Sequence, residues 1–163
     1  MTVETLATEC LDNPLKQKIP QNPRTASGTL RSTHKSILRL CDALEAVADS
    51  LPANVNRNAC RRLADDLVPT LKDAQETEEM QVFPQLRHTA AGPQAAGEVL
   101  DRLTYEHFED LCFAEEVTET LKRLSSGDVV NTEAVGYMLR GLFGALRRHI
   151  ALEQELVANR LQP

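Results

Sequence analysis

Three of the four histidines stand where an apolar residue would normally face the interior of a helical protein. His34, His107 and His149 each interrupt a run of apolar residues spaced three and four apart. Glu153 follows His149 by one helical turn on the same face. Burying imidazole and carboxylate groups without partners costs free energy, so we expect something inside the protein to pair with them. The simplest partner is a metal ion held between helices.

Amphipathic periodicity extends over most of the chain and predicts an all-α fold. The 163-residue sequence is rich in strong helix formers, has no Trp, and rarely clusters β-branched residues. Four long helices joined by short connections predict an up-down-up-down four-helix bundle over residues 28–163, preceded by an irregular N-terminal arm over residues 1–27. Their expected ranges are Ser27 or Thr29 to Leu51, Val55 to His88, Gln94 to Leu124, and Asn131 or Thr132 onward.

A second acidic residue, Glu78, falls on the apolar stripe of the second helix, in which Pro69 should cause a kink or a break. In an antiparallel bundle an early residue of one helix meets a late residue of the next. His34 therefore matches Glu78 in height, and both match the late pair His149 and Glu153. His107, near the middle of its helix, matches this level less closely.

The donor types narrow the choice of metal. Imidazole nitrogen with carboxylate oxygen suits iron, zinc or manganese better than calcium, which prefers oxygen ligands alone. The Glu-x-x-His pair of ferritin-like di-iron bundles is missing before every histidine, because those positions hold Arg31, Thr104, Leu146 and, before His88, Gln85. A ferritin-type site is therefore not expected.

From about Leu30 to the C-terminus, the chain resembles the hemerythrin-like (HHE cation-binding) family. The motifs that carry the resemblance are Thr33-His34-Lys35, Glu78-Glu79-x-x-x-Phe83-Pro84, Glu106-His107-x-x-Asp110 and Arg147-Arg148-His149-Ile150-Ala151-Leu152-Glu153. The resemblance implies a centre of two non-haem irons, with carboxylates bridging the metals and histidines capping them. Carried onto this chain, Glu78 and Glu153 would be the bridges, His34 would serve one iron, and His107 with His149 the other.

The second helix departs from the family pattern. The family's motif there is His-x-x-x-Glu, and Ala74 stands in place of the histidine that would precede Glu78. Gln75, Glu79, Asp110 or water are the candidates to complete the ligand shell. Two alternatives stay open: a site with one metal, or a site that has lost its metal.

Composition argues against several other classes of function. The net charge of −6 gives no electrostatic support for binding nucleic acid. No apolar run approaches the roughly 20 residues needed to span a bilayer, and no signal peptide is recognisable. The four cysteines show no Cys-x-x-Cys spacing, and Cys41 and Cys112 fall in apolar helical segments. We expect reduced core thiols and a cytoplasmic protein.

The sequence thus predicts a small iron protein that interacts with O2, NO or peroxide, or that holds or senses iron. No nucleophile or organic-substrate pocket is recognisable, so we expect no turnover of an organic substrate. One alternative is a metal-poor bundle that acts as a regulatory or interaction module, as a homodimer with the N-terminal arm as the contact. Another is a mononuclear site with a structural role.

Overall fold

The computed structural model describes residues 23–89 and 93–161, which are almost entirely helical. The long helices are α1 (Pro23–Ser50), α2 (Arg57–Thr77), α4 (Pro93–Ser126) and α5 (Thr132–Leu161), and α2 continues into a π-helical turn, η1 (Glu78–Val82), and a short helix, α3 (Phe83–Thr89). These residues contain no strand, so the prediction of an all-α fold is confirmed.

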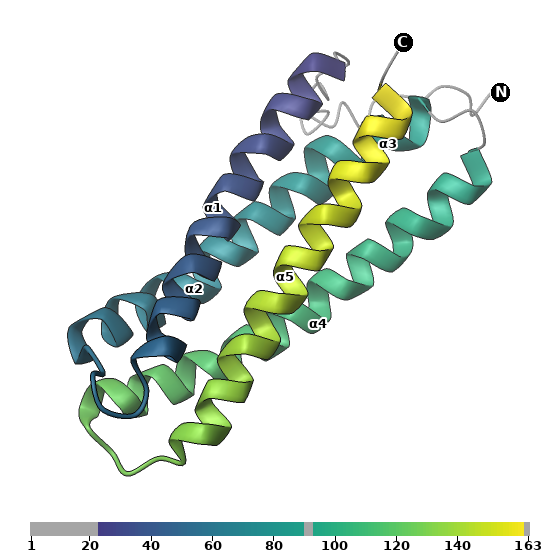
Figure 1. The fold of residues 1–163 in the computed structure, drawn as a ribbon. Coiled ribbons are helices and arrows are strands. Elements are labelled where there is room, and N and C mark those ends of the chain that lie inside the picture. Colours follow the sequence, from purple (N-terminus) through teal and green to yellow (C-terminus); the bar gives the residue numbers. More distant parts are fainter. Residues whose placement is uncertain (1–22, 90–92, 162–163) are drawn as a thin grey trace, which may run out of the picture.

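The long helices pack as a bundle in which each has two main neighbours. α1 packs against α2 and α5, and α4 packs against the same two helices, so α1 and α4 lie on a diagonal. Figure 1 shows consecutive long helices running in opposite directions. Late residues of α2 and α5 are therefore brought beside early residues of α1.

Apolar side chains form two separate buried clusters. The main core involves α1, α2, α4 and α5 and includes Leu44, Leu71 and Leu121. The end core is smaller, lies around η1 and α3, and consists of Leu30, Val82, Phe83, Leu86, Leu100 and Leu103. The expected apolar stripes supply most of both clusters. Between the two clusters lies one level of the bundle interior that is not filled by apolar side chains.

Helix α1 begins at Pro23, earlier than the expected start at Ser27 or Thr29. Proline fits the first turn of a helix because its fixed φ is already helical and its missing N–H would have no partner there. The last residues of the predicted N-terminal arm, from Pro23 on, are therefore helical, so the predicted start of the helix is too late. Residues 1–22, the rest of the arm, lie outside the described residues.

Of the two effects predicted for Pro69, a kink or a break, the break is wrong, because α2 runs through that residue to Thr77. Pro69 is exposed, so water can replace the N–H that the helix lacks. The helix changes character later, where the backbone N–H of Phe83 bonds to the carbonyl of Glu78 in a π turn. This wider turn starts a new helix at the Phe83-Pro84 pair, where a proline is tolerated.

Local signals fix the other helix ends. Asn56 caps α2 by accepting from the N–H of Ala59 at 3.0 Å, and Asn131 precedes α5, accepting from the N–H groups of Glu133 and Ala134 at 3.1 Å. Gly127 ends α4 with φ of 81°, a conformation that favours glycine. These ends set the register in which the polar residues of neighbouring helices meet.

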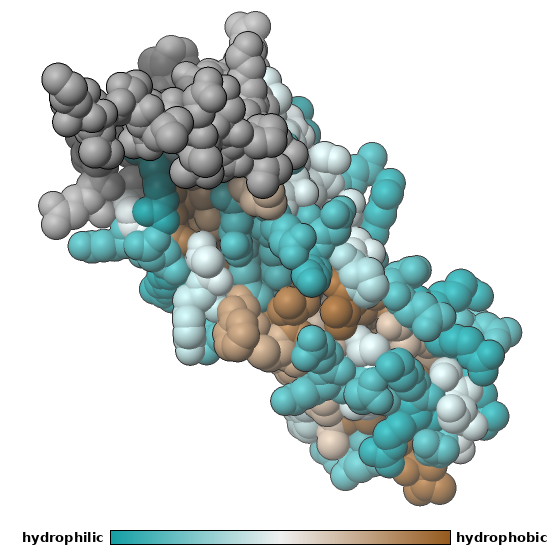
Figure 2. Space-filling view, turned by 180° about the vertical axis from the view of Figure 1, so that it is seen from behind, coloured by the Kyte–Doolittle hydropathy of each residue, from teal (hydrophilic) through white to brown (hydrophobic). Residues whose placement is uncertain are grey.

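The surface is mainly polar, although apolar side chains gather near the middle of the face shown in Figure 2. Cys112 is exposed, so its placement in the core was wrong, whereas Cys41 is buried as expected. Among the helices described, none combines the length and apolar character that crossing a membrane would require.

Candidate metal centre

A buried polar cluster occupies the level between the main core and the end core. Its members are His34 of α1, Glu78 of η1, His107 of α4, and His149 and Glu153 of α5. None is more than 7% exposed. On α1, for example, His34 lies between Leu30 of the end core and Ile37 of the main core. All five residues that the sequence nominated as principal ligands are therefore brought to one interior volume.

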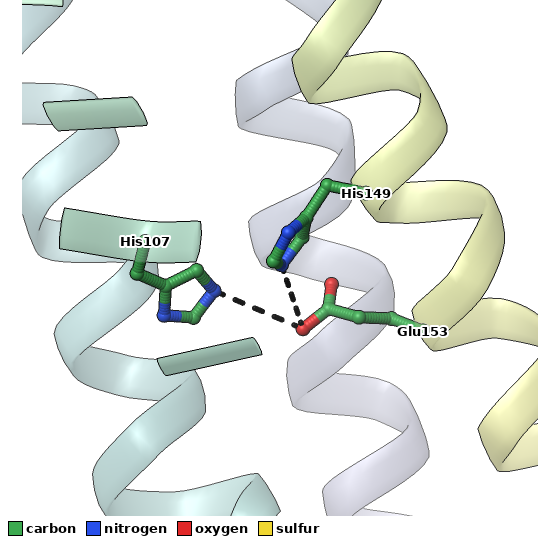
Figure 3. A group of neighbouring side chains, drawn as sticks. All are labelled: His107, His149 and Glu153. Atoms are coloured by element: carbon green, nitrogen blue, oxygen red, sulfur yellow. Dashed lines mark ion pairs between the residues drawn. The ribbon is translucent and has the colours of Figure 1, made fainter. Parts of the chain in front are cut away.

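The carboxylate of Glu153 lies between two groups of histidines. Its Oε2 is 2.7 Å from His34 Nε2, while its Oε1 is 3.5 Å from His149 Nε2 and 4.0 Å from His107 Nε2. Figure 3 shows the rings of His107 and His149 directed at the same oxygen. We call these two sides of the cluster the His34 end and the paired-histidine end.

Glu78 spans the same two ends from the opposite helix. Its Oε1 is 3.9 Å from His34 Nε2, and its Oε2 is 3.5 Å from His107 Nε2. Thr33 is hydrogen-bonded to Oε1, which fixes the carboxylate from the α1 side. Each of the two carboxylates thus offers one oxygen to each end, as a bridging ligand of two metal ions would.

Two further carboxylates hold the paired histidines from outside the cluster. The ring N–H at Nδ1 of His107 donates to Glu79 Oε1 at 2.8 Å, and that of His149 donates to Glu106 Oε2 at 3.3 Å. A proton on Nδ1 leaves Nε2 with a free lone pair, the form in which imidazole binds a metal. Both Nε2 atoms face inward, toward Glu153.

Four buried atoms at this end have no hydrogen-bond partner within the described part of the chain. They are Glu78 Oε2, His107 Nε2, His149 Nε2 and Glu153 Oε1. Two ligand atoms that each lie about 2.1 Å from one ion are roughly 3–4 Å apart, which is the range of spacing seen here. Buried polar atoms rarely stay unpaired, and the ligand atoms of His107, His149 and Glu153 lie within 4.8 Å of one another, with Glu78 Oε2 3.5 Å from His107 Nε2. The paired-histidine end therefore fits a metal ion with nitrogen and oxygen ligands.

The His34 end fits a second ion less well. It offers one imidazole and one oxygen from each carboxylate, and these ligand atoms lie within 4.8 Å of one another. His34 Nε2 is at hydrogen-bonding distance from Glu153, closer than two ligands of a common ion usually lie. Ala74, one turn before Glu78, is buried and supplies no donor.

The two bridging candidates have opposite electrostatic environments. Burial, followed by the negative charge of Glu153, raises the pKa of Glu78 to about 8. Burial also disfavours the charge on Glu153, but its interactions with the imidazoles of His149 and His34 outweigh burial and lower its pKa to about 2. Without a metal, the cluster therefore retains one ionised and one protonated carboxyl group near neutral pH.

The pKa values of the two paired histidines are also shifted in opposite directions. Burial, together with the positive charge of protonated His149, lowers the pKa of His107. Burial opposes the charge of His149 as well, but interaction with Glu153 outweighs it and raises its pKa. A divalent cation would replace these protons, since it favours neutral imidazoles and ionised carboxylates.

The additional candidate ligands lie outside the two groups of converging atoms. Glu79 contacts the outer nitrogen of His107 rather than the interior. Asp110 is buried, which raises its pKa to about 6, and its charge affects His149. Gln75 is buried, but no hydrogen bond joins it to the cluster among the described residues. The contact of Glu106 with His149 was not predicted from the sequence. The one sequence feature that could have indicated it is the position of Glu106 directly before His107 in the motif.

Replacement of Glu78 by Gln tests the cost of burying this carboxylate. Because the pKa of Glu78 is raised, the folded protein holds its proton to higher pH than the unfolded chain does. Its stability contribution is therefore fully present below about pH 4.5 and is lost as pH rises toward 8. We expect metal-free Glu78→Gln to exceed wild type in unfolding free energy by up to about 4 kcal/mol at about pH 8, and by about 1 kcal/mol or less near pH 5.

Chemical denaturation of the metal-free proteins at both pH values measures this difference. Glu76→Gln is the matched control, since the Glu76 side chain is 60% exposed and lies on α2, only two residues before Glu78. It should show no gain that depends on pH. A Glu78→Gln protein that is less stable than wild type at the higher pH would contradict the electrostatic account.

Comparison with known proteins agrees with this geometry. The sequence profile described as the hemerythrin HHE cation-binding domain matches residues 25–161, which include all four long helices in large part and every member of the cluster. No curated protein and no solved structure matched the chain at the threshold applied. The match spans most of the sequence, and the chain belongs to the hemerythrin HHE cation-binding domain family.

Proposed function

We propose that this domain binds two iron ions in the bundle and interacts through them with O2, NO or peroxide, or senses or holds the iron itself. In this proposal Glu78 and Glu153 bridge the ions, His107 and His149 bind one, and His34 binds the other. The observation that carries it is the convergence of buried, unpartnered ligand atoms from separate helices on one point. Membership of a cation-binding family supports the same conclusion.

Iron, when bound, would supply one-electron chemistry toward small oxidants. The protein itself would determine the environment of the metal. The end core and the main core cover the cluster on both sides with buried leucine side chains such as Leu103 and Leu142. Glu79 and Glu106 hold the imidazole rings in place. Exclusion of water and fixed ligands are the means by which a protein tunes a redox metal.

A mononuclear site is the second candidate, and the structure contains a specific observation in its favour. The paired-histidine end has two imidazoles and a carboxylate oxygen within 4.8 Å of one another, whereas the His34 end has a single imidazole, and Ala74, one turn before Glu78, supplies no donor. One ion at the paired-histidine end would satisfy the unpartnered atoms. In that case the metal would join η1, α4 and α5 and have a structural role.

Metal analysis of protein expressed with ample iron and purified without oxygen distinguishes these possibilities. Two irons per chain support the di-iron proposal, and a change of the near-ultraviolet absorption on adding O2 or NO supports interaction with those gases. One metal per chain supports the mononuclear candidate. A protein that holds no metal under these conditions would overturn both and favour a regulatory or interaction role.

The fourth histidine offers a matched control for a ligand substitution. We expect His149→Ala to lose tight metal binding, because it removes an inward-facing Nε2 from the paired-histidine end. His88→Ala should keep the full metal content, since His88 is exposed and lies outside the cluster. Metal per folded chain, measured by elemental analysis after gel filtration, compares the two. An unchanged metal content in His149→Ala would show that the assigned site is wrong.

The position of Ala74 permits the opposite test. We expect Ala74→His to raise the occupancy of the second ion, because it adds an imidazole one turn before Glu78 on a buried face. Ala64→His is the control: Ala64 is as buried on the same helix but lies far from Glu78 in sequence. It should lower stability without any gain in metal. Equal iron content in wild type and Ala74→His would mean that no ligand is lacking there.

The outer carboxylate of Glu79 is expected to act through His107. Its removal in Glu79→Ala should weaken metal affinity about tenfold, because the ring loses the acceptor that fixes its tautomer. Glu79→Gln should recover most of the affinity, since an amide oxygen also accepts from Nδ1. Competition with a chelator measures these values, with Glu76→Ala as the surface control. Full loss of metal in Glu79→Gln would instead indicate that Glu79 is a ligand.

A further inference from the structure

A groove between α1 and α5 leads from the surface to the buried cluster. Its volume is about 590 Å³, and the side chain of His34 forms part of its lining. α1 and α5 are neighbours along the bundle (Figure 1). His34 itself is only 3% exposed, so it contributes to the floor of the groove rather than to its rim.

Three cationic side chains of α1 line this groove. Arg31, Lys35 and Arg39 follow one another at intervals of four residues, so they lie along one face of the helix. None of them forms an ion pair with any residue in the described part of the chain. The acidic residue of the groove, Asp42, is bound instead by Arg147 at 3.0 Å.

The positive charge of this groove is unusual in a protein that is acidic overall. The protein has a net charge of −6, yet this groove holds three cations that have no acidic partner among residues 23–89 and 93–161, and one carboxylate, Asp42, that is paired with Arg147. Arginine and lysine side chains gathered without partners are the arrangement that binds carboxylate or phosphate groups. The ligand that fits by charge is therefore an anion.

The remaining lining indicates that the anion has an apolar part. Leu30, Leu38 and Val157 supply apolar walls, while Ser27 and Gln154 supply hydrogen-bonding groups. Small-molecule sites commonly combine apolar walls with a few polar groups that orient the ligand. We propose that this groove binds a small organic anion, with its acidic group among Arg31, Lys35 and Arg39 and its apolar body against the walls.

The bound anion would lie over the His34 end of the cluster, since His34 forms the floor. Arg31, Lys35, Arg39 and the apolar walls of the groove are not among the proposed metal ligands. This inference therefore does not depend on the proposed function. A result showing no anion binding would not alter the metal content expected for the protein.

A set of three matched probes tests the inference on the full chain. Octanoate carries a carboxylate and an apolar body, octanamide keeps the body without the charge, and acetate keeps the charge without the body. We expect calorimetry to show octanoate binding at least about tenfold more tightly than either of the others. Methyl resonances of Leu30, Leu38 and Val157 should shift with octanoate. Binding of octanamide or acetate as tight as that of octanoate would overturn the proposal.

Substitutions that remove one positive charge at a time test whether the anion binds in this groove. Lys35→Gln and Arg39→Gln should each weaken octanoate binding about fivefold to tenfold, and high salt should weaken wild-type binding as well. Arg61→Gln is the control, because Arg61 is an exposed arginine of α2 outside the groove. Equal affinity in all three variants would contradict the assignment. Metal content and thermal stability, measured in parallel, verify that each variant is folded and that the cluster is intact.

Discussion

The structure depends on the burial of two carboxylates, Glu78 and Glu153, at one level of a helical bundle. Removing a charged group from water is costly, and two such groups close together raise the cost further. The three imidazoles that surround them offset part of this energy, and protonation of Glu78 relieves another part. A cation between them would offset the rest, so an arrangement that is costly without a metal is suited to hold one.

The outer hydrogen bonds determine which atoms face the interior. Glu79 and Glu106 accept from the Nδ1 groups of His107 and His149, so the lone pair of each Nε2 is directed at Glu153. The consecutive residues Glu78 and Glu79 begin the π turn, and they approach the two different nitrogens of the His107 ring. The stacked ring of Phe83, whose centroid is 5.5 Å away, holds His107 from a further direction. Rigid ligands of this kind need little reorganisation on binding a metal.

The two ends of the cluster offer different numbers of nitrogen donors, and the difference has a local cause. Ala74 provides a methyl group where the family pattern has an imidazole, so the His34 end has one nitrogen donor and the paired-histidine end has two. The groove between α1 and α5 opens at the weaker end, where His34 forms its floor. The groove and the single imidazole thus occur on the same side of the cluster, while Leu30 and Leu103 of the end core lie one turn before His34 and His107.

Spacing along the sequence determined which residues face inward, because the period of a helix is a property of its own residues. It placed His149 and Glu153 on one face and predicted the helices that carry His34, Glu78 and His107. Tertiary structure decided what the sequence left open: that His107 reaches the same level, that Glu106 and Glu79 turn toward imidazoles of other helices, and that Pro84 rather than Pro69 coincides with the irregular turn. Cys112 looked like a core residue and is exposed. Helical periodicity says which way a side chain points from its own axis, but its partners depend on the rotation and height of a neighbouring helix, which are fixed only when the bundle packs.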